Sequence, residues 1–472
     1  MKEEQLSFLN WTGNPFVDSG IAAILEHCRK KAPEEIDVDD LSKMSMLLRQ
    51  VYVTAQWKKA FHSIFTGNCK LLQNAYKTDE RRHKEFFGLL DQLLAGVEIA
   101  GETGDCIACG RRDRHKRKTK TDIPLTGSGK SRGFFSYAVA GADYCETCAF
   151  ATQCSPLTYY ACGKLAMLHS TSPKIMRYWA KRPLANIYEQ MARDEFTGCF
   201  NEGYTNPQNA LFHIAQNLVL EHREQWGKEY ATIRLYHFTN YLQGPELDIY
   251  DLPTPVFCFL FEVQSHSRLK DWQAIVRRGY YFLDKKNHKQ ITYPTDGKSE
   301  DDYKNKDNRV YVNLLAGKSI LPYFLNIQTR TAYGDYSLLT VYIKEILAMD
   351  EKRIDTVKRV ADEIARFIQQ SPKGKTRLQN LEGADKLHEF CNVLRHISRE
   401  RIALRPQEPL FTLDEFAQQL FPEGALTFRE TRYLILFRLY EQLHDWLVAE
   451  GLAEDQTDDV TLGTDDSELA IG

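Results

Sequence analysis

Apolar residues recur every three or four positions through the first hundred residues of the chain. The pattern runs through SGIAAILEHCRKK, DDLSKMSMLLRQVYVTAQWKKAFHSIF and DERRHKEFFGLLDQLLAGVEIA. This spacing gathers the apolar side chains on one face of a helix. A serine directly before such a run is a common N-cap, so Ser19 is expected to cap the first helix. We therefore predict a helical N-terminal part over residues 1–105.

The pattern becomes mixed between residues 151 and 348. NPQNALFHIAQNLVLEHREQW keeps helical spacing, whereas YATIRLYHF, PVFCFLFEVQ and RVYVNLL are short runs rich in β-branched and aromatic residues. Runs of this kind are typical of strands. This part of the chain is therefore predicted to be an α+β body.

Helical spacing dominates again toward the C-terminus, in SLLTVYIKEILAMDEKRIDTVKRVADEIARFIQQ, GADKLHEFCNVLRHISRERIA, TLDEFAQQLF and FRETRYLILFRLYEQLHDWLVAEG. Loops that contain proline separate these segments, and proline ends helices. We predict a C-terminal helical bundle over residues 349–451. The fold class expected for the whole chain is then α+β, mostly helical.

The composition is that of a globular protein of several domains, with 43% hydrophobic and 26% charged residues among 472. No apolar run approaches the roughly 18 residues that suggest a membrane span, and the N-terminus lacks the basic-then-apolar order of a signal peptide. We expect a cytoplasmic protein without a membrane partner. The eleven cysteines fit that compartment because they show no disulfide framework.

The net charge of −3 conceals an asymmetry along the chain. Residues 1–348 carry 45 basic and 40 acidic residues, whereas residues 349–472 carry 16 and 24. Seven of those acids follow Leu452 in a segment without a basic residue, which predicts an acidic disordered tail over residues 452–472. A local basic face on this acidic C-terminal part could still come from residues such as Lys352, Arg353, Arg359, Arg366 and Lys373.

Two CxxC pairs are the strongest chemical signal, Cys106 with Cys109 and Cys145 with Cys148. Two such pairs can close a four-sulfur Zn²⁺ site, which has no open position for a substrate and therefore holds the fold. We predict a structural zinc ion in an insertion over residues 106–150, with disulfides or a chance spacing of the cysteines as the alternatives. Cys154 could substitute as a ligand, but a buried thiol is the simpler interpretation of this residue.

The 35 residues between the two pairs exceed the usual ribbon gap of about 15 to 20, and they are strongly basic. We expect this loop to neutralise DNA phosphates, although a charge run is also typical of an ordinary solvated surface. The motif TGSGKS in the same loop is an incomplete phosphate loop, because Pro124 replaces its first glycine. The candidate DNA contacts of the loop are Arg111, Arg112, Arg114, Lys116, Arg117, Lys118, Lys120, Lys130 and Arg132.

A second basic cluster, Arg268, Lys270, Arg277 and Arg278, lies with Trp272, Tyr280 and Tyr281 in SRLKDWQAIVRRGYYFL, a predicted helix. This composition suits a face that grips a nucleic-acid backbone and stacks on bases. It equally suits an amphipathic helix that covers a sheet, and the sequence does not separate the two.

A metal-dependent nuclease is the enzymatic alternative. FLFEVQ would place Glu262 and Gln264 on a strand downstream of Asp248 and Asp251, but Gln264 stands where a catalytic lysine is expected. No Ser/His/Asp or Cys/His grouping stands out. The sequence therefore predicts no catalytic residues and does not indicate an enzyme.

The opening NWTGNPFVDSGIAAIL, the basic insertion between CIAC and CETC, the mixed middle and the helical end together resemble a known family. This is the CXXC-CXXC group of large subunits from type I CRISPR surveillance complexes (Cascade), most like type I-B. The resemblance implies a protein that is not the nuclease. Such a subunit sits at the foot of a crRNA-bearing filament, reads the protospacer-adjacent motif and helps to separate the strands of the target DNA.

The resemblance also implies the partners. These are the backbone, foot and small subunits of the crRNA-bearing complex, target double-stranded DNA, and a trans-acting helicase-nuclease or a transposition adaptor. In such a complex guide pairing supplies the sequence specificity. The helical C-terminal part of type I-B large subunits is often also produced separately as a small subunit.

Asn10 and Asn14 could read base edges in the motif, because amide side chains can donate to and accept from adenine. The alternative is that NPF followed by DSG forms a turn and a helix cap, with Asn14 or Asp18 bonded to the backbone. We expect a non-enzymatic, zinc-stabilised DNA-recognition subunit. A nuclease using the Glu262 region and a zinc-ribbon scaffold that binds only protein remain as alternatives.

Overall fold

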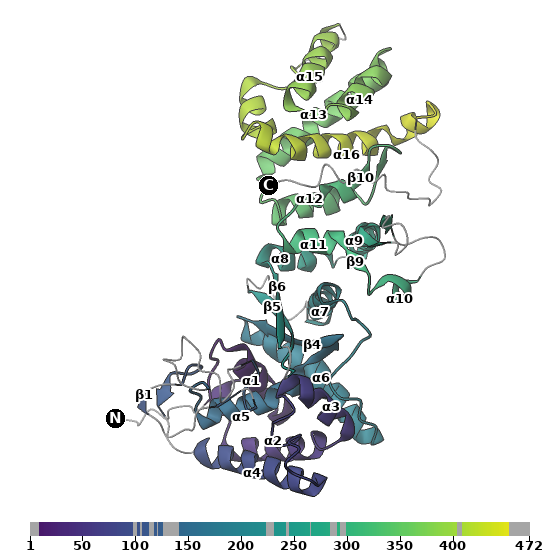
Figure 1. The fold of residues 1–472 in the computed structure, drawn as a ribbon. Coiled ribbons are helices and arrows are strands. Elements are labelled where there is room, and N and C mark those ends of the chain that lie inside the picture. The colour runs from purple at the N-terminus through teal and green to yellow at the C-terminus, as the bar shows by residue number, and fades with distance from the viewer. Residues whose placement is uncertain are drawn as a thin grey trace. The chain divides into compact units, whose positions relative to one another are not determined.

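The computed structural model describes residues 9–97, 102–103, 106–112, 118–119, 121–125, 141–222, 231–241, 245–264, 266–283, 290–292, 299–403 and 408–452 (Figure 1). It is mostly helical with small antiparallel sheets, which confirms the predicted α+β class. The chain forms two compact units, Met1–Thr254 and Pro255–Gly472. Their boundary falls inside the stretch 151–348 that the sequence suggested as one body, and the other predicted boundaries stay predictions.

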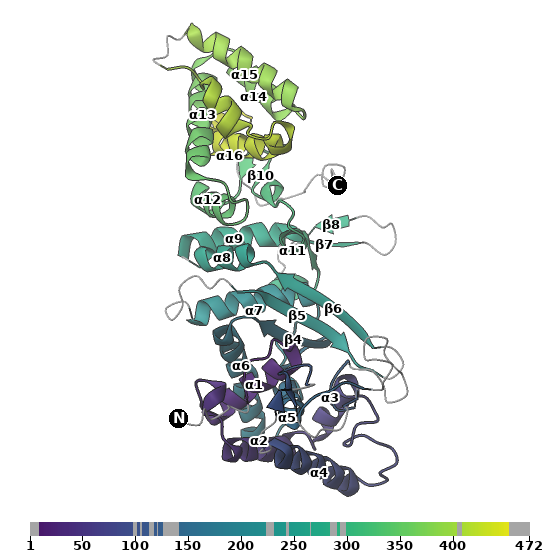
Figure 2. The same ribbon diagram turned by 90° about the vertical axis from the view of Figure 1, so that its left-hand side faces the viewer.

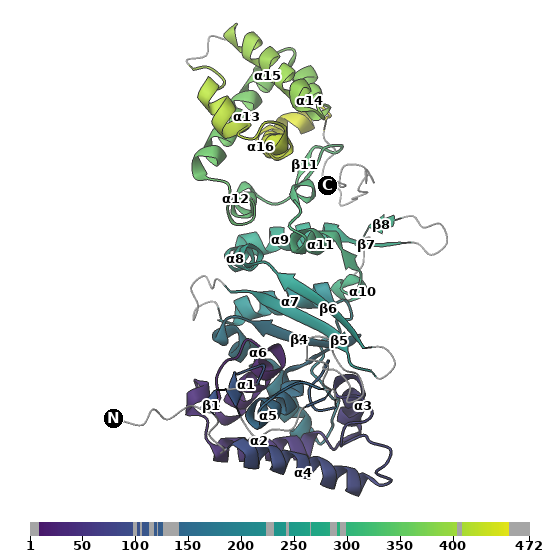
Figure 3. The ribbon, with the colours of Figure 1, turned by 60° about the vertical axis from the view of Figure 1, so that its left-hand side comes forward.

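The N-terminal unit contains an antiparallel sheet of order β3-β4-β5-β6. α7 packs against β5 and β6, whereas α1 and α6 pack against β4 (Figure 2). α4 lies along the outside of α2 and α5 (Figure 3). The strands are β1 (Glu102–Thr103), β2 (Arg111–Arg112), β3 (Tyr160–Cys162), β4 (Lys164–Ser170), β5 (Ile233–Thr239) and β6 (Glu246–Leu252). The helices are α1 (Pro15–Cys28), η1 (Pro33–Glu35), α2 (Val38–Val51), α3 (Ala55–Ile64), α4 (Asp79–Val97), α5 (Glu146–Cys154), η3 (Ser155–Thr158), α6 (Pro173–Arg193) and α7 (Pro207–His222).

α1 is the central helix of this unit. Every residue from Phe16 to Leu25 is buried, because α5, α6, η3 and β4 pack around the helix. The expected cap at Ser19 is wrong. The N-cap of α1 is Asn14, five residues earlier, and its side chain accepts from the backbone N–H groups of Phe16 and Val17. Asn14 is also a preferred N-cap residue, and the proline that follows it fits the first helical position.

α1 and α5 cross with their backbones in close contact at Gly20. A Cβ atom on Gly20 would lie 1.7 Å from the carbonyl oxygen of Ala151. A side chain at position 20 is therefore impossible unless the two helices separate. The last glycine of TGNPFVDSG is explained by this crossing.

The C-terminal unit is helical, with the three-stranded sheet β8-β7-β9 and the hairpin β10-β11. Its strands are β7 (Tyr280–Leu283), β8 (Gln290–Thr292), β9 (Asp307–Asn308), β10 (Leu325–Asn326) and β11 (Thr331–Ala332). Its helices are α8 (Thr254–Val263), α9 (His266–Gly279), α10 (Glu300–Tyr303), α11 (Arg309–Leu315), η5 (Leu321–Tyr323), α12 (Tyr336–Glu345), α13 (Glu351–Gln370), α14 (Gly374–Glu382), α15 (Leu387–Ile402), the π-helix η6 (Glu415–Leu420) and α16 (Ala425–Ala449).

Two of the strands expected in this part of the chain are helices. PVFCFLFEVQ forms α8 and RVYVNLL forms α11. Short apolar runs carry no reliable period, so a buried helix and a buried strand read alike. At α11 the deciding signal is Asn308, whose side chain accepts from the N–H groups of Val310 and Tyr311. Of the helices in the described part of the chain, none is both long and apolar enough to cross a membrane.

Replacing Gly20 with alanine tests the helix crossing. We expect Gly20→Ala to destabilise the N-terminal unit by about 3 kcal/mol or more, because the added methyl group forces two packed backbones apart. Gly88→Ala in α4 is the matched control, since nothing lies within 4 Å of its added Cβ. The control should be neutral or stabilising by up to about 1 kcal/mol. Thermal unfolding followed by circular dichroism measures both, and equal melting temperatures for the two variants would contradict the crossing.

Candidate metal centre

Four cysteines that lie up to 42 positions apart meet in the N-terminal unit. The sulfur atoms of Cys106, Cys109, Cys145 and Cys148 all lie within 4.8 Å of one another. Cys106, Cys145 and Cys148 are buried, and Cys109 is half-buried. The predicted pairing of the two CxxC motifs is therefore present as a single sulfur cluster.

The first CxxC pair follows one strand of a short hairpin and precedes the other. β1 and β2 pair antiparallel, with Glu102 opposite Arg112. Within the connection the Gly110 N–H donates to the Cys106 carbonyl at 2.8 Å, which closes a tight turn around Cys109. The Ile107 N–H donates to the Asp143 carbonyl at 2.9 Å. This bond ties the first pair to the segment that leads into the second.

The second CxxC pair lies at the start of α5. Cys145 is the N-cap of this helix, and its sulfur accepts from the Cys148 N–H at 3.4 Å. The positive end of the helix dipole stabilises negative charge at this position. Both sulfurs of the pair are thus held by the helix itself, in a place that favours thiolates.

The sulfur spacing fits a tetrahedral metal ion. Zn–S bonds of about 2.3 Å in a tetrahedron separate the sulfurs by about 3.8 Å. The Cys109 and Cys145 sulfurs are 3.6 Å apart, and no two of the four sulfurs are more than 4.8 Å apart. The donor set therefore fits a closed four-thiolate metal site, which would be held by these four residues alone.

Electrostatics favour the same occupant. The pKa of Cys106 falls to about 6, because the Cys109 contact that raises it is outweighed by hydrogen bonds from Cys145 and Cys148. The pKa values of Cys145 and Cys148 are raised, chiefly by their hydrogen bonds to Cys106. Ionisation of the Cys106 sulfur therefore disfavours ionisation of Cys145 and Cys148. A divalent cation would remove this repulsion and let every thiol ionise.

Cys154 does not belong to the cluster. It ends α5, is fully buried, and its thiol donates to the Phe150 carbonyl at 3.4 Å. Burial raises the pKa of this thiol well above its usual value. The interpretation of Cys154 as a buried thiol, rather than as a ligand, agrees with this position.

The N-terminal motif packs directly against the second CxxC pair. The Asn14 side-chain N–H donates to the Tyr144 hydroxyl at 2.9 Å, and Tyr144 precedes Cys145. Burial raises the pKa of Tyr144 to about 12. The Asn14 amide therefore both caps α1 and holds the cysteine segment. These bonds agree with the alternative in which Asn14 caps a helix. Asn14 could read a base edge only if they broke.

Asp18 organises the rest of the same motif. Its buried carboxylate accepts from the Thr12 N–H at 2.8 Å and from the Gly13 N–H at 2.9 Å. The His169 ring on β4 lies 3.2 Å from Oδ2 of this carboxylate, the oxygen that also accepts from Gly13. The polar residues of TGNPFVDSG thus fix the entry into α1. Sequence reasoning missed His169, since nothing in its local sequence marks it as a partner of Asp18.

Lys118 is a correction among the basic candidates. Its ammonium group lies 2.7 Å from the Glu146 carboxylate, and both side chains are less than 10% exposed. A buried, paired lysine cannot contact DNA. Arg111 and Arg112 lie on β2, and their side chains lie outside the described residues, as do Arg114, Lys116, Arg117, Lys120, Lys130 and Arg132.

The second basic cluster divides between the two faces of α9. Lys270 and Arg277 are exposed, whereas Arg268 donates to the Glu262 carbonyl at 3.0 Å. Trp272 is fully buried, so this helix covers a core. Tyr280 and Tyr281 follow the helix on β7. The amphipathic interpretation holds for the helix, and an outward basic face is left to Lys270 and Arg277.

Arg278 is the second correction. It is 6% exposed, its guanidinium lies 3.3 Å from the centre of the Tyr333 ring, and it donates to the Tyr323 carbonyl. Its Nε and one terminal nitrogen have no hydrogen-bond partner. Burial lowers its pKa to about 10. Arg278 therefore stabilises the inside of the C-terminal unit and is not at the surface.

The basic face expected on the C-terminal bundle is largely paired with acids. Arg353 is buried and contacts Glu430 at 3.5 Å, and Arg359 contacts Glu415 at 2.7 Å. Arg366 pairs with Glu363, and Lys373 with Glu400. Lys352 is exposed. These pairs leave a weaker positive surface than the number of basic residues suggests.

The residues of the nuclease alternative lie on different kinds of element. Glu262 is on α8 and not on a strand, while Asp248 and Asp251 are on β6. Asp251 pairs with Arg234, and Asp248 lies 3.7 Å from Lys164. Among the described residues, the cysteine cluster is the one group of three or more metal-ligating side chains. The strand-end arrangement on which that alternative depended is therefore absent from the described part.

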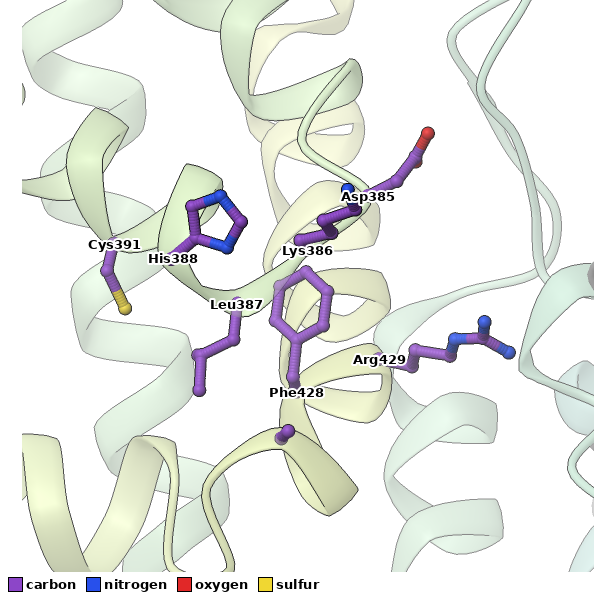
Figure 4. A pocket seen from close by; sticks show the side chains of 8 residues that line it. Asp385, Lys386, Leu387, His388, Cys391, Phe428 and Arg429 are labelled. Carbon is purple, nitrogen blue, oxygen red and sulfur yellow. The ribbon is translucent and has the colours of Figure 1, made fainter.

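A hollow of about 610 Å³ lies in the C-terminal unit, where α15 and α16 begin (Figure 4). Phe428 and Leu387 line its apolar side. Asp385 is the one carboxylate among its lining residues, and it pairs with Arg432 at 3.2 Å. The lining residues therefore offer no pair of carboxylates for acid–base chemistry.

Comparison with known proteins gives one match. The family model described as CRISPR-associated protein (Cas_CXXC_CXXC) matches residues 101–160, which contain both CxxC pairs and α5. No curated protein and no solved structure matches the chain. The match supports a CRISPR-associated role, and it coincides with the part of the chain that the sulfur cluster organises.

Metal analysis of paired serine variants tests the site. We expect the purified protein to carry about one metal ion per chain, and Cys148→Ser to lose it because three thiolates no longer close the tetrahedron. Cys154→Ser changes a buried thiol on the same helix and should keep the metal, since a hydroxyl can still donate to Phe150. Elemental analysis by mass spectrometry measures the stoichiometry. A metal-free wild-type protein, or equal loss in both variants, would refute the assignment.

Proposed function

We propose that this chain is a non-catalytic DNA-recognition subunit of an RNA-guided CRISPR effector complex. It would read the protospacer-adjacent motif, assist duplex opening and recruit a separate helicase-nuclease or transposition proteins. The observation that carries the proposal is the match of residues 101–160 to a CRISPR-associated family. That match falls on the segment whose two ends are joined by the four-cysteine cluster.

The chemistry of the insertion supports a role in DNA binding. Zn²⁺ is the metal that four thiolates in a closed tetrahedral site favour, and it supplies structural rigidity there. Leaving out Lys118, six basic residues remain between Arg111 and Lys120. Contacts from such residues to phosphates would be independent of sequence and would weaken steeply with salt. Guide pairing would supply the specificity, so this subunit needs no catalytic group.

The packing of the cysteine cluster against the N-terminal motif also supports the proposal. The cysteine cluster and the N-terminal motif form a single packed block through the Asn14–Tyr144 bond. A rigid block is what a loop needs if it is to hold DNA in one register. The remaining role of Asn10, which is exposed, in reading base edges is part of the proposal.

A zinc-ribbon scaffold that binds only protein is the second candidate. The exposed apolar side chains Leu247 and Ile249 on β6 favour it, because apolar side chains at a sheet edge are suited to a protein partner. This candidate predicts that removing positive charge from the insertion leaves the affinity for DNA unchanged. The two functions are thus separated by one measurement.

Charge neutralisation provides that measurement. Changing Arg114, Lys116 and Arg117 to glutamine should weaken binding to duplex DNA regardless of its sequence. The variant should also make the slope of log affinity against log salt concentration shallower by about 2 to 3. Each phosphate contact that is lost removes the release of about 0.9 counterions on binding. Fluorescence anisotropy over a range of salt concentrations measures both quantities.

The control is the same change at Lys77, Arg81 and Lys84, which are exposed at or near the start of α4. If the two triple variants lose the same affinity, the loss comes from the change in net charge and not from the insertion. Unchanged affinity in the first would favour the protein scaffold. Cleavage of DNA by the purified protein with Mg²⁺, lost in Glu262→Ala, would instead establish the nuclease.

A further inference from the structure

Among the described residues, one buried arginine of the C-terminal unit has no acidic partner. Four arginine side chains are buried in the described part of the chain, all of them in this unit. Three of the four contact a carboxylate, in the pairs Arg353–Glu430, Arg401–Glu363 and Arg432–Asp385. The fourth is Arg278, and none of the described carboxylates pairs with it. Its positive charge is therefore the exception in this unit.

The unused nitrogens of Arg278 lie on one edge of its guanidinium group. Nη1 donates to the Tyr323 carbonyl, whereas Nε and Nη2 have no hydrogen-bond partner among the described residues. The N–H bonds of Nε and Nη2 point the same way. This edge is a two-pronged fork that matches two oxygens of a carboxylate or of a phosphate. We call Nε and Nη2 of Arg278 the guanidinium fork.

Burial makes the guanidinium fork unfavourable while it stays unpaired. The side chain is 6% exposed, and burial lowers its pKa to about 10, so the group remains charged at neutral pH. A buried charge is costly unless it is paired and hydrogen-bonded. The position of Arg278 in the last turn of α9 lets the helix dipole offset part of this cost. The fork is nevertheless left without an acceptor in the described part of the chain.

Tyrosine rings and a second arginine lie around this guanidinium. The guanidinium carbon of Arg278 is 3.3 Å from the centre of the Tyr333 ring, and that of Arg309 is 4.8 Å from the centre of the Tyr281 ring. Burial raises the pKa of Tyr323 to about 12, against the opposing effects of Arg309 and Arg278. Two positive charges thus lie near Tyr323. This arrangement favours a ligand with more than one negative charge.

The guanidinium fork is closed to solvent in this structure, so a ligand can reach it only if the site opens. Tyr323 is buried, whereas Tyr333 is half-buried. The Tyr333 N–H donates to the Phe324 carbonyl at 2.7 Å, which holds the backbone in place. Opening therefore requires the side chains of Tyr333 and Arg278 to part, and it breaks the stack between them.

We propose that Arg278 is the centre of a phosphate-binding site in the C-terminal unit, which the stack with Tyr333 keeps closed in this structure. A phosphate group would accept from both prongs of the guanidinium fork, and Arg309 would help to balance its second negative charge. A carboxylate carries one charge and suits this pair of cations less well. Inorganic phosphate and the backbone of a nucleic acid both carry the required group.

Isothermal titration calorimetry with inorganic phosphate at constant ionic strength tests the fork. The wild-type protein should bind phosphate. Arg278→Lys keeps the charge but offers no planar fork, so its phosphate affinity should fall by about ten-fold or more, the effect of one lost charged hydrogen bond. A wild-type protein that binds no phosphate, or equal binding by Arg278→Lys, would overturn the proposal.

Arg401→Lys is the matched control for this measurement. Arg401 is as buried as Arg278, at 6% exposed, but Glu363 already occupies its guanidinium. This variant disturbs an interior arginine of the same unit and should bind phosphate as the wild type does. Equal losses in the two variants would show a general effect of disturbing the interior, and they would refute the assignment to Arg278.

Tyr333→Ala keeps the proposal testable if Arg278→Lys does not fold. The variant removes the stack that opening has to break, so its phosphate affinity should rise by about two- to five-fold, the usual strength of such a cation–π contact near the surface. Melting temperatures show whether each variant is folded. Unchanged or weaker phosphate binding by folded Tyr333→Ala would contradict a site that this ring closes.

A fluorescein-labelled oligothymidylate separates the two sources of phosphate. If a nucleic-acid backbone occupies the site, Arg278→Lys should weaken binding of the oligonucleotide, followed by fluorescence anisotropy, by about the same factor as binding of inorganic phosphate. If free phosphate occupies it, the oligonucleotide affinity should stay unchanged. Only the first outcome rests on the proposed function, so a protein that binds phosphate but no DNA would lose that function and keep this site.

Discussion

The N-terminal unit depends on one close contact, the crossing of α1 and α5 at Gly20 and Ala151. α5 begins with the second CxxC pair, so the depth of this crossing sets where two of the four sulfurs lie. The same crossing brings the start of α1 beside Tyr144, where Asn14 bonds to it. The N-terminal motif TGNPFVDSG and the cysteine pairs lie far apart in the sequence, yet they are parts of one packed structure. This arrangement explains why a turn, a cap, a buried aspartate and a glycine follow one another so closely.

Local patterns were sufficient where a helix or a ligand set carries its own signal. The amphipathic spacing of the N- and C-terminal parts gave helices, and the CxxC spacing gave a cluster of four sulfurs. The strands predicted from PVFCFLFEVQ and RVYVNLL were wrong because a short apolar run does not show whether its period is that of a helix or of a strand. The π-helix η6 lies in TLDEFAQQLF, where helical spacing was recognised without its type.

Side-chain roles were harder to predict than elements because they depend on distant partners. Lys118 looks like its basic neighbours in the sequence, yet its contact with Glu146 makes it an interior residue. Arg278 likewise belongs to a basic helix, yet it faces Tyr333 and lies under the surface. Composition predicts how many charges a segment has. Which of them reach solvent is decided by the tertiary fold, through contacts that no spacing rule contains.

The Lys118–Glu146 ion pair ties Lys118 to the helix that carries the second CxxC pair. Glu146 lies between the two cysteines of that pair, so a substitution that shifted the start of α5 would displace both the partner of the lysine and two of the sulfurs. Changes at Lys118 and at the cysteine-bearing turn are therefore expected to arise together in related chains rather than one at a time.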